Sequence, residues 1–230
     1  MSIELPVYTV EGEKTERVVQ LAESVFGIQP NMHVIYLDVK RYLASQHRGT
    51  HKTKTRGEVQ ASKRKIRPQK YTGQARLGQR SSPVLRGGGV AHGPRPRDYS
   101  IKLNKKVVNL ARRSALSLKL KMQLETPEQT IFRVIEDFSF EEPKTKKMVR
   151  LLTAQKASDR FTILLLPEPD RIIYLSGRNI PYLEVIPFYQ LNTYLVSRAY
   201  TLLFTESAIK KLEALLLAGM PQKQREDVSV

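Results

Sequence analysis

Two glycines near the middle of the chain have the spacing of a phosphate-binding loop. Gly73 and Gly78 are separated by four residues, as in the loops that hold nucleotide phosphates with backbone N–H groups. Those loops continue with Lys and then Ser or Thr, whereas Gln79 and Arg80 follow here. No GxGxxG motif follows a predicted strand either. The sequence therefore argues against a nucleotide-binding site.

The histidines do not form a metal-binding pattern. His47 and His51 are four residues apart, which can place two side chains on one helix face, but Gly49 lies between them. No carboxylate or cysteine completes a ligand set beside them. His33 and His92 have no identifiable partner. We expect no metal, and we interpret His47 and His51 as polar residues where a helix ends.

Carboxylates are equally scarce where catalysis would need them. Glu58 and Asp98 are the two acidic residues of a long basic stretch, and general acid–base or two-metal chemistry depends on such groups. Asp98 is flanked by Arg95 and Arg97, so we interpret it as part of an ion pair or a turn. The sequence contains no cysteine, which excludes thiol catalysis by this chain. We predict no catalytic residue, no cofactor and no enzymatic activity.

Charge is the strongest signal in the sequence. The 230 residues carry 39 Lys and Arg against 22 Asp and Glu, a net charge of +17. Of these, 17 basic and 2 acidic residues lie between Arg48 and Lys106, which leaves a near balance of 22 and 20 elsewhere. An excess of this size predicts a polyanionic partner, nucleic acid first and an anionic membrane second.

The segment that carries the excess, residues 48–101, is not expected to fold by itself. It holds 8 of the 12 glycines, and its few apolar residues follow neither a helical nor a strand period. Its apolar surface is too small to offset the conformational entropy lost on ordering. We predict an extended arm that RNA orders, in which Arg and Lys neutralise phosphates and glycine lets the backbone approach closely. Since Tyr71 and Tyr99 are its only aromatic residues, backbone and shape recognition is favoured over base reading.

The sequence on either side of this segment predicts an α/β domain. Apolar residues recur at helical spacing in residues 32–46 and 103–122, the two helices that bracket the segment. Strands that alternate with helices then predict a mostly parallel sheet flanked by helices on both faces, with a long extended basic loop inserted. The strands are expected at 129–137, 161–166, 182–186 and 200–204, and the further helices at 144–157, 189–196 and 206–218.

Each bracketing helix has a predicted apolar face. The first helix begins at the candidate N-cap Asn31, and its apolar face comprises Met32, Ile35, Val39, Tyr42 and Leu43. The apolar face of the second comprises Val107, Leu110, Ala111, Ala115 and Leu118. The basic outer face of that second helix is expected to include Lys105, Lys106, Asn109, Arg112 and Arg113.

The predicted globular domain is discontinuous in sequence. It comprises residues 1–47 and 102–221, with residues 48–101 as the inserted loop and 222–230 as a polar C-terminal tail. No signal peptide is predicted at the start, and the longest apolar runs are too short to span a bilayer. We therefore expect no membrane partner.

Several long motifs resemble one family. GTHKTKTRGEV (49–59), QK.TG.AR (69–76), SPV.RGGG (82–89), GPRPRDYS.KLNKK (93–106) and RRSALS (112–117) are similar to those of the bacterial-type ribosomal protein L4 of the large subunit. The resemblance continues loosely across the predicted α/β part and so covers nearly the whole chain.

This resemblance implies a cytoplasmic, non-enzymatic protein that binds large-subunit rRNA early in ribosome assembly. It implies that the extended loop lines the constriction of the nascent-peptide exit tunnel. The partners are then rRNA, neighbouring large-subunit proteins including L22 at the tunnel, and transiently the nascent peptide, with no homo-oligomer expected. A free regulatory protein that represses its own operon mRNA stays open as an alternative or additional role.

Basic residues in and beside the loop are the predicted RNA-binding residues. They are Arg48, Lys52, Lys54, Arg56, Lys63, Arg64, Lys65, Arg67, Lys70, Arg76, Arg80, Arg86, Arg95, Arg97, Lys102, Lys105, Lys106, Arg112 and Arg113.

The resemblance implies that residues 68–74 form the tunnel-lining tip, and the sequence departs from the family there. Pro68 replaces a frequently basic residue, Tyr71 a frequent Gly, and Gln74 a frequent Arg or Gly. These changes predict a constriction that is less positive and narrower. The predicted tip residues are Pro68, Gln69, Lys70, Tyr71, Thr72, Gly73 and Gln74.

Overall fold

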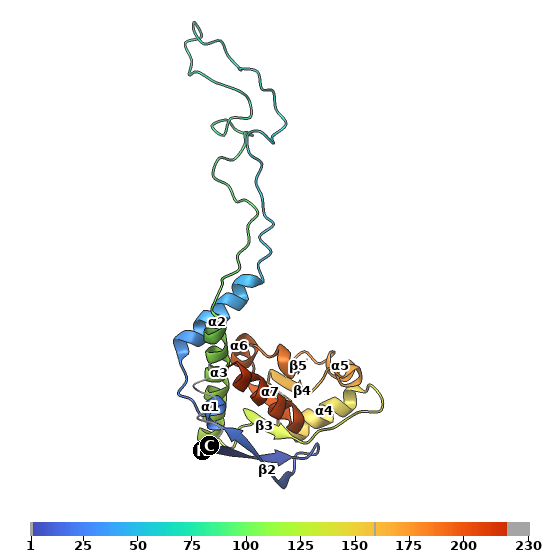
Figure 1. Ribbon diagram of the computed structural model, residues 1–230. Coiled ribbons are helices and arrows are strands. Elements are labelled where there is room, and N and C mark those ends of the chain that lie inside the picture. The colour runs from blue at the N-terminus through green and yellow to red at the C-terminus, as the bar shows by residue number, and fades with distance from the viewer. Residues whose placement is uncertain (1, 159, 220–230) are drawn as a thin grey trace. The chain divides into compact units, whose positions relative to one another are not determined.

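The computed structural model describes residues 2–158 and 160–219, and the chain divides into two units. The first unit comprises residues up to Tyr42 and from Lys102 onward, and the second comprises Leu43–Ile101 (Figure 1). The polar tail predicted at residues 222–230 lies outside the described residues.

A six-stranded sheet forms the centre of the first unit, with the strand order β2-β1-β3-β6-β4-β5 (Figure 1). The first two strands pair antiparallel, and all the other neighbouring strands pair in parallel. This arrangement confirms the predicted, mostly parallel sheet. The strands are β1 (Ser2–Tyr8), β2 (Lys14–Ala22), β3 (Phe132–Ile135), β4 (Thr162–Leu166), β5 (Leu183–Pro187) and β6 (Thr201–Thr205).

Helices cover both faces of this sheet. One apolar layer joins the sheet to helices α1, α3, α6 and α7, and the other joins it to α4 and α5. The helices are α1 (Glu23–Phe26), α2 (Met32–Ser45), α3 (Lys105–Glu125), α4 (Thr145–Ala154), α5 (Arg171–Gly177), α6 (Thr193–Arg198) and α7 (Glu206–Ala218), with a 3-10 turn η1 at Phe188–Gln190.

Strand β4 shows why the central strands are apolar throughout. Ile163 and Leu165 belong to the first layer, while Leu164 and Leu166 belong to the second. Successive side chains of a strand point to opposite faces, so a strand covered on both faces must be apolar at every position. The continuous apolar run at 161–166 thus correctly predicted a buried parallel strand.

The elements predicted after residue 128 are confirmed, with shifted ends and one exception. The helix expected at 189–196 is split into η1 and α6. Asn192 causes the split, because its side-chain oxygen accepts a hydrogen bond from the N–H of Leu195 at 2.8 Å and so caps a new helix. The hairpin β1–β2 and the helices α1 and α5 were not predicted.

The predicted apolar face of α2 is only partly confirmed. Ile35 is buried, but Met32 and Leu43 are 62% and 42% exposed. The N-cap prediction is confirmed, since the Asn31 side chain accepts a hydrogen bond from the N–H of Val34 at 3.2 Å. A carboxylate takes part of the buried face instead: Asp38 is 2% exposed and accepts a hydrogen bond from the Arg41 Nε at 2.7 Å.

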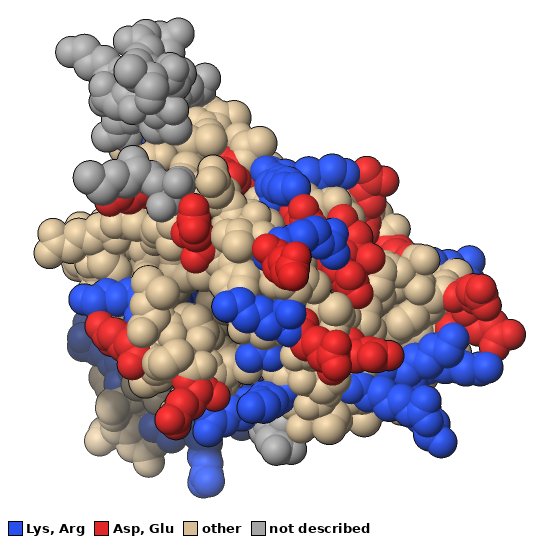
Figure 2. Space-filling model, turned by 90° about the horizontal axis from the view of Figure 1, so that it is seen from below, with Lys and Arg blue, Asp and Glu red and all other residues tan. Residues whose placement is uncertain are grey.

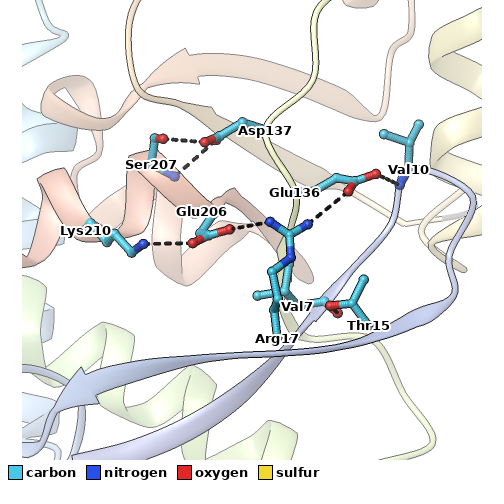
Figure 3. A network of polar contacts seen from close by, with 9 residues as sticks. All are labelled: Val7, Val10, Thr15, Arg17, Glu136, Asp137, Glu206, Ser207 and Lys210. Carbon is cyan, nitrogen blue, oxygen red and sulfur yellow. Dashed lines mark hydrogen bonds and ion pairs between the residues drawn. The ribbon is translucent and has the colours of Figure 1, made fainter.

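A polar network at the carboxyl ends of β3 and β6 connects the β1–β2 hairpin to the parallel strands (Figure 3). Arg17 of β2 contacts Glu136 at 3.2 Å and Glu206 at 3.4 Å, and Lys210 contacts Glu206 at 2.7 Å. Asp137 accepts hydrogen bonds from the backbone and hydroxyl of Ser207. Since Arg17 is largely exposed, each ion pair contributes little stability, and the network mainly fixes geometry.

The first prediction concerns the independence of the globular unit. Replacing Lys63–Arg86 by a short Gly-Ser linker should leave a cooperative thermal unfolding transition, because no apolar side chain of that segment is buried. Circular dichroism at increasing temperature measures this. A chain that loses its cooperative transition would contradict the insertion of the loop into a self-sufficient core.

Leu164→Ala is the control for the loop replacement, because it removes a buried side chain of the core. Leu164 is fully buried between the sheet and the layer that contains α4 and α5. Its truncation should lower the free energy of unfolding by about 2–5 kcal/mol, through lost burial and the cavity left behind. Urea denaturation of the loop-replaced chain and of Leu164→Ala compares the contributions of the loop and of the core to the free energy of unfolding. A loss below about 1 kcal/mol in Leu164→Ala would contradict the two-layer core.

Candidate nucleic-acid interface

Residues 48–101, which make up most of the second unit, have no apolar core. None of the apolar side chains of residues 48–101 is buried, and Ile66, Tyr71, Val84 and Val90 are exposed. Most of its basic side chains are exposed as well. The segment therefore presents charge along its whole length, with nothing inside it to bury.

Backbone hydrogen bonds nevertheless join its outgoing and returning limbs. They are too sparse for a regular pair of strands, and the single isolated bridge joins Lys65 and Gln79. The limbs therefore run as an irregular hairpin whose shape depends on a few cross-links. In order along the outgoing limb, these are Arg97 to Gly49 at 3.2 Å, Thr53 to Pro94 at 3.2 Å, Val90 to Lys54 at 2.9 Å and Ile66 to Gly78 at 3.0 Å.

Glycine is required where the limbs approach most closely. A Cβ on Gly89 would lie 2.3 Å from the backbone nitrogen of Arg56. A Cβ on Gly49 would lie 2.0 Å from the carbonyl oxygen of Arg97, and Gly49 also has a positive φ of 61°. No other residue fits either position without moving the opposite limb.

An aromatic and cationic cluster closes the start of the hairpin. The rings of His47 and His51 lie 5.8 and 6.0 Å from the ring of Tyr99, and the Tyr99 hydroxyl is 3.1 Å from His51 Nε2. The guanidinium of Arg97 lies over the same ring, 4.5 Å from its centre. His51 thus packs on a tyrosine 48 residues away, and His47 contacts the same ring. Among the described residues, no group of three or more His, Cys, Asp or Glu could hold a metal ion.

The two carboxylates of the segment have structural partners. Glu58 accepts hydrogen bonds from Lys52 Nζ at 2.6 Å and from the N–H of Thr55 at 3.0 Å, and the hydrogen bond from Lys52 contributes most to lowering its pKa. Asp98 accepts hydrogen bonds from the hydroxyl and the N–H of Ser100, at 2.6 and 2.9 Å, which lower its pKa. Asp98 forms no ion pair with a described residue, and its contacts are with Ser100, two residues further along the chain. Both carboxylates therefore act as local hydrogen-bond acceptors.

The predicted tip lies beyond the last cross-link between the limbs. Tyr71 is fully exposed and has a φ of +66°, in the left-handed region that favours glycine. Gly73 has a φ of +61°. Two residues of seven therefore need the left-handed conformation, which makes the tip a tight, backbone-determined turn.

Beside the tip is a hollow with a strongly basic lining. Its volume is about 640 Å³, and the lining includes Arg64, Lys65, Arg67 and Arg80. No carboxylate lines it. A cavity with four cations and no anion has the electrostatics for a phosphate group.

The predicted RNA-binding residues are largely exposed and free of acidic partners. Among the described ion pairs, only Lys52 of this set takes part in one, with Glu58. Arg67 is half-buried rather than exposed. The exposed members are Arg48, Lys52, Lys54, Arg56, Lys63, Arg64, Lys65, Lys70, Arg76, Arg80, Arg86, Arg95, Arg97, Lys102, Lys105 and Lys106.

Two arginines of α3 correct the prediction of a basic outer face. Arg113 is 8% exposed, and its Nη1 donates a hydrogen bond to the carbonyl of Ser24 at 3.3 Å. Arg112 is half-buried, and burial lowers the pKa of both arginines. Arg113 is buried because α1 packs on its side of α3, where Ser117 also donates to the carbonyl of Val25. The charged neighbours of Arg112 are Asp38 and Arg41 of α2. Arg113 thus anchors α1 and does not face outward.

Sequence reasoning also missed how His47, His51 and Tyr99 converge. The signal was available only in part: Tyr99 is an aromatic residue in an otherwise polar limb. Nothing in the sequence pairs it with residues 48 or more positions earlier.

The described helices include none that is both long and apolar enough to cross a membrane.

Known proteins are similar to this chain over most of its length. The model of the ribosomal protein L4/L1 family matches residues 19–215. A large ribosomal subunit protein uL4 from Parabacteroides distasonis is 48% identical over 211 residues, covering 92% of this chain and 98% of the relative.

Two further relatives carry the same name. The uL4 protein of Bacteroides fragilis is 48% identical over 215 residues, covering 94% of this chain and 100% of the relative. The uL4 protein of Porphyromonas gingivalis is 45% identical over 216 residues, with the same coverage. The match extends through both the α/β unit and the basic hairpin, and so the chain belongs to the ribosomal protein L4/L1 family.

Proposed function

We propose that this protein is a structural constituent of the large ribosomal subunit that binds large-subunit rRNA through residues 48–101. One observation carries the proposal: a hairpin with a large excess of cations and no buried apolar side chain is inserted into an α/β unit that has its own core. Relatives that align over nearly the full chain are named large ribosomal subunit protein uL4.

The physical basis of binding is neutralisation of phosphate charge. Exposed Lys and Arg side chains along both limbs replace counterions on the RNA, and their release favours the complex. Only a few backbone hydrogen bonds join the limbs, and most of their basic side chains are exposed and available to RNA. The absence of a catalytic cluster in the sequence supports a binding role rather than an enzymatic one.

The wider assignment follows the family. We propose that residues 1–47 and 102–221 act as the globular domain and residues 48–101 as the rRNA-binding loop, in the cytoplasm where ribosomes work. L22 at the tunnel, other neighbouring large-subunit proteins and, transiently, the nascent peptide complete the set of partners. In this assignment Lys102, Lys105 and Lys106 are further exposed RNA-binding cations that follow the loop in sequence, while Arg113 does not take part.

The tip residues 68–74 are proposed to line the constriction of the exit tunnel. The left-handed φ of Tyr71 supports this alignment, because the family frequently has Gly at this position. The ring of Tyr71 is fully exposed, so it adds volume on the outside of the turn. A constriction that contains Tyr71, Pro68 and Gln74 is narrower and less positive than one built on the usual family residues.

Association with the ribosome gives the next prediction. In a cell lysate spun through a sucrose gradient in high salt, the protein should co-sediment with large subunits, because many phosphate contacts act together. A protein found solely in the free pool would contradict the structural role. That result would instead favour the alternative of a regulatory mRNA-binding protein.

Charge removal at the hairpin should weaken rRNA binding in a salt-dependent way. The triple variant Lys63→Ala, Arg64→Ala, Lys65→Ala should lower the slope of log K against log salt by about 2–3, since each lost phosphate contact removes about 0.7–0.9. Filter binding of transcribed rRNA at several salt concentrations measures the slope. The matched control removes three exposed cations of α4 (Lys146, Lys147, Arg150), and equal losses in both triples would contradict a localised interface.

The tunnel assignment predicts a local change at Tyr71. In ribosomes that carry Tyr71→Gly, the narrowest passage at the tip should widen, because the ring is lost and the left-handed backbone is kept without strain. A cryo-EM comparison with wild-type ribosomes measures the passage, with Thr72→Ala as the control. A map in which the Tyr71 ring is turned into rRNA, away from the lumen, would contradict the narrowing.

A further inference from the structure

A second group of free cations lies in the globular unit, at the amino ends of β4 and β6. Arg160 precedes β4, and Arg198 ends α6 just before β6. The Arg160 guanidinium lies over the ring of Tyr200, 3.9 Å from its centre, and the Arg198 guanidinium lies over the ring of Phe161 at 4.3 Å. Each arginine therefore stacks on the aromatic residue of the neighbouring strand, so the two pairs are crossed.

The two aromatic residues are adjacent and fixed. The N–H of Tyr200 donates to the carbonyl of Phe161 at 2.8 Å, where the parallel strands begin. The Tyr200 hydroxyl donates to the side chain of Gln129, and Phe161 packs against the first apolar layer. Since neighbouring strands lie about 4.8 Å apart, the two stacked guanidiniums belong to one small surface.

Backbone contacts hold the arginines in place. The hydroxyl of Thr162 donates to the carbonyl of Arg160 at 2.9 Å. Lys119 Nζ donates to the carbonyl of Ala199 at 2.5 Å, directly after Arg198, and burial lowers the pKa of Lys119. This hydrogen bond fixes the backbone beside Arg198.

The guanidiniums themselves have unused hydrogen-bond donors. Both arginines are exposed, and neither guanidinium forms a hydrogen bond or an ion pair with any described residue. Stacking fixes the plane of a guanidinium while its N–H edge stays available, and that edge matches a phosphate group in a bidentate manner. A pair of exposed surface arginines without this support would lose more side-chain entropy on binding.

We propose that Arg160 and Arg198 form a second RNA-binding site, which holds the phosphate backbone of large-subunit rRNA at the globular unit independently of the basic hairpin. This site rests on the proposed function, because it takes rRNA as the source of the phosphates. The crossed stacks hold two planar cations ready before RNA arrives. The hairpin and the globular unit then each have a contact of their own.

The test uses the full-length protein and transcribed large-subunit rRNA of the source organism, titrated at several salt concentrations. The double variant Arg160→Ala, Arg198→Ala should bind about tenfold more weakly near 0.1 M salt and lower the salt slope by about 1.4–1.8. The control variant Arg171→Ala, Arg178→Ala removes two exposed arginines of α5 and its end, with the same change in net charge. It should leave the slope within about 0.5 of wild type.

A conservative pair separates binding from folding. Arg160→Lys, Arg198→Lys keeps both charges but loses the planar, stacked fork, so it should bind several-fold more weakly with a nearly unchanged slope. If the alanine variant shows no cooperative thermal unfolding and is therefore not folded, the lysine variant still tests the role of the stacked guanidiniums. Lysine variants that bind as wild type does would overturn a role for the stacked guanidiniums.

The outcomes distinguish failure of the proposed function from failure of the second RNA-binding site. If wild type does not bind rRNA, the proposed function and the second site both fail. If wild type binds and the Arg160/Arg198 alanine variant behaves like the Arg171/Arg178 control, the second site alone is overturned. A larger loss of affinity and slope in the Arg160/Arg198 variant supports it.

Discussion

Unbalanced charge in the hairpin is the constraint on which the rest of the molecule depends. Between Arg48 and Lys106 the chain carries 17 cations and 2 anions, and both anions are already engaged, Glu58 by Lys52 and Asp98 by Ser100. Such a segment repels itself, and none of the apolar side chains between residues 48 and 101 is buried. Its two limbs stay joined by a few backbone hydrogen bonds and by glycines that permit close approach. The missing counter-charge and the missing core must both come from a polyanion.

The globular unit has the opposite character. Both faces of its sheet are buried, and its charges are mixed: Figure 2 shows Lys and Arg interspersed with Asp and Glu over one face of the molecule. At the carboxyl ends of the strands, Arg17 and Lys210 neutralise Glu136 and Glu206, as Figure 3 shows. These acidic groups are thus paired within the fold of the globular unit. The buried apolar core thus lies in one part of the chain, and most of the excess positive charge lies in the other.

How far the sequence predicts this structure depends on whether the relevant contacts are local. The strands after residue 128 were predictable because a strand buried on both faces must be apolar throughout, as in β4. The edge strand β2 was not, since most of its side chains face solvent and its pattern includes charges. The burial of Arg113 depends on the carbonyl of Ser24, 89 residues away, and the stacking of His51 on Tyr99 spans 48 residues. No periodicity in the sequence encodes such long-range contacts.

The arginines of this chain show how the same side chain serves two purposes. Arg113 is buried on a backbone carbonyl and fixes the packing of α1, whereas the exposed Arg97 lies over the half-buried ring of Tyr99 in the hairpin. Arg160 and Arg198 repeat the second arrangement in the globular unit, with their N–H edges unpaired among the described residues. A stacked guanidinium keeps its charge and its donors while its orientation is held by an apolar ring. Stacking alone does not distinguish them, since Arg133 lies over the ring of Tyr8 and also donates hydrogen bonds to Gln155. The combination of a stacked guanidinium and a free N–H edge therefore separates Arg160 and Arg198 from the arginines that serve the fold.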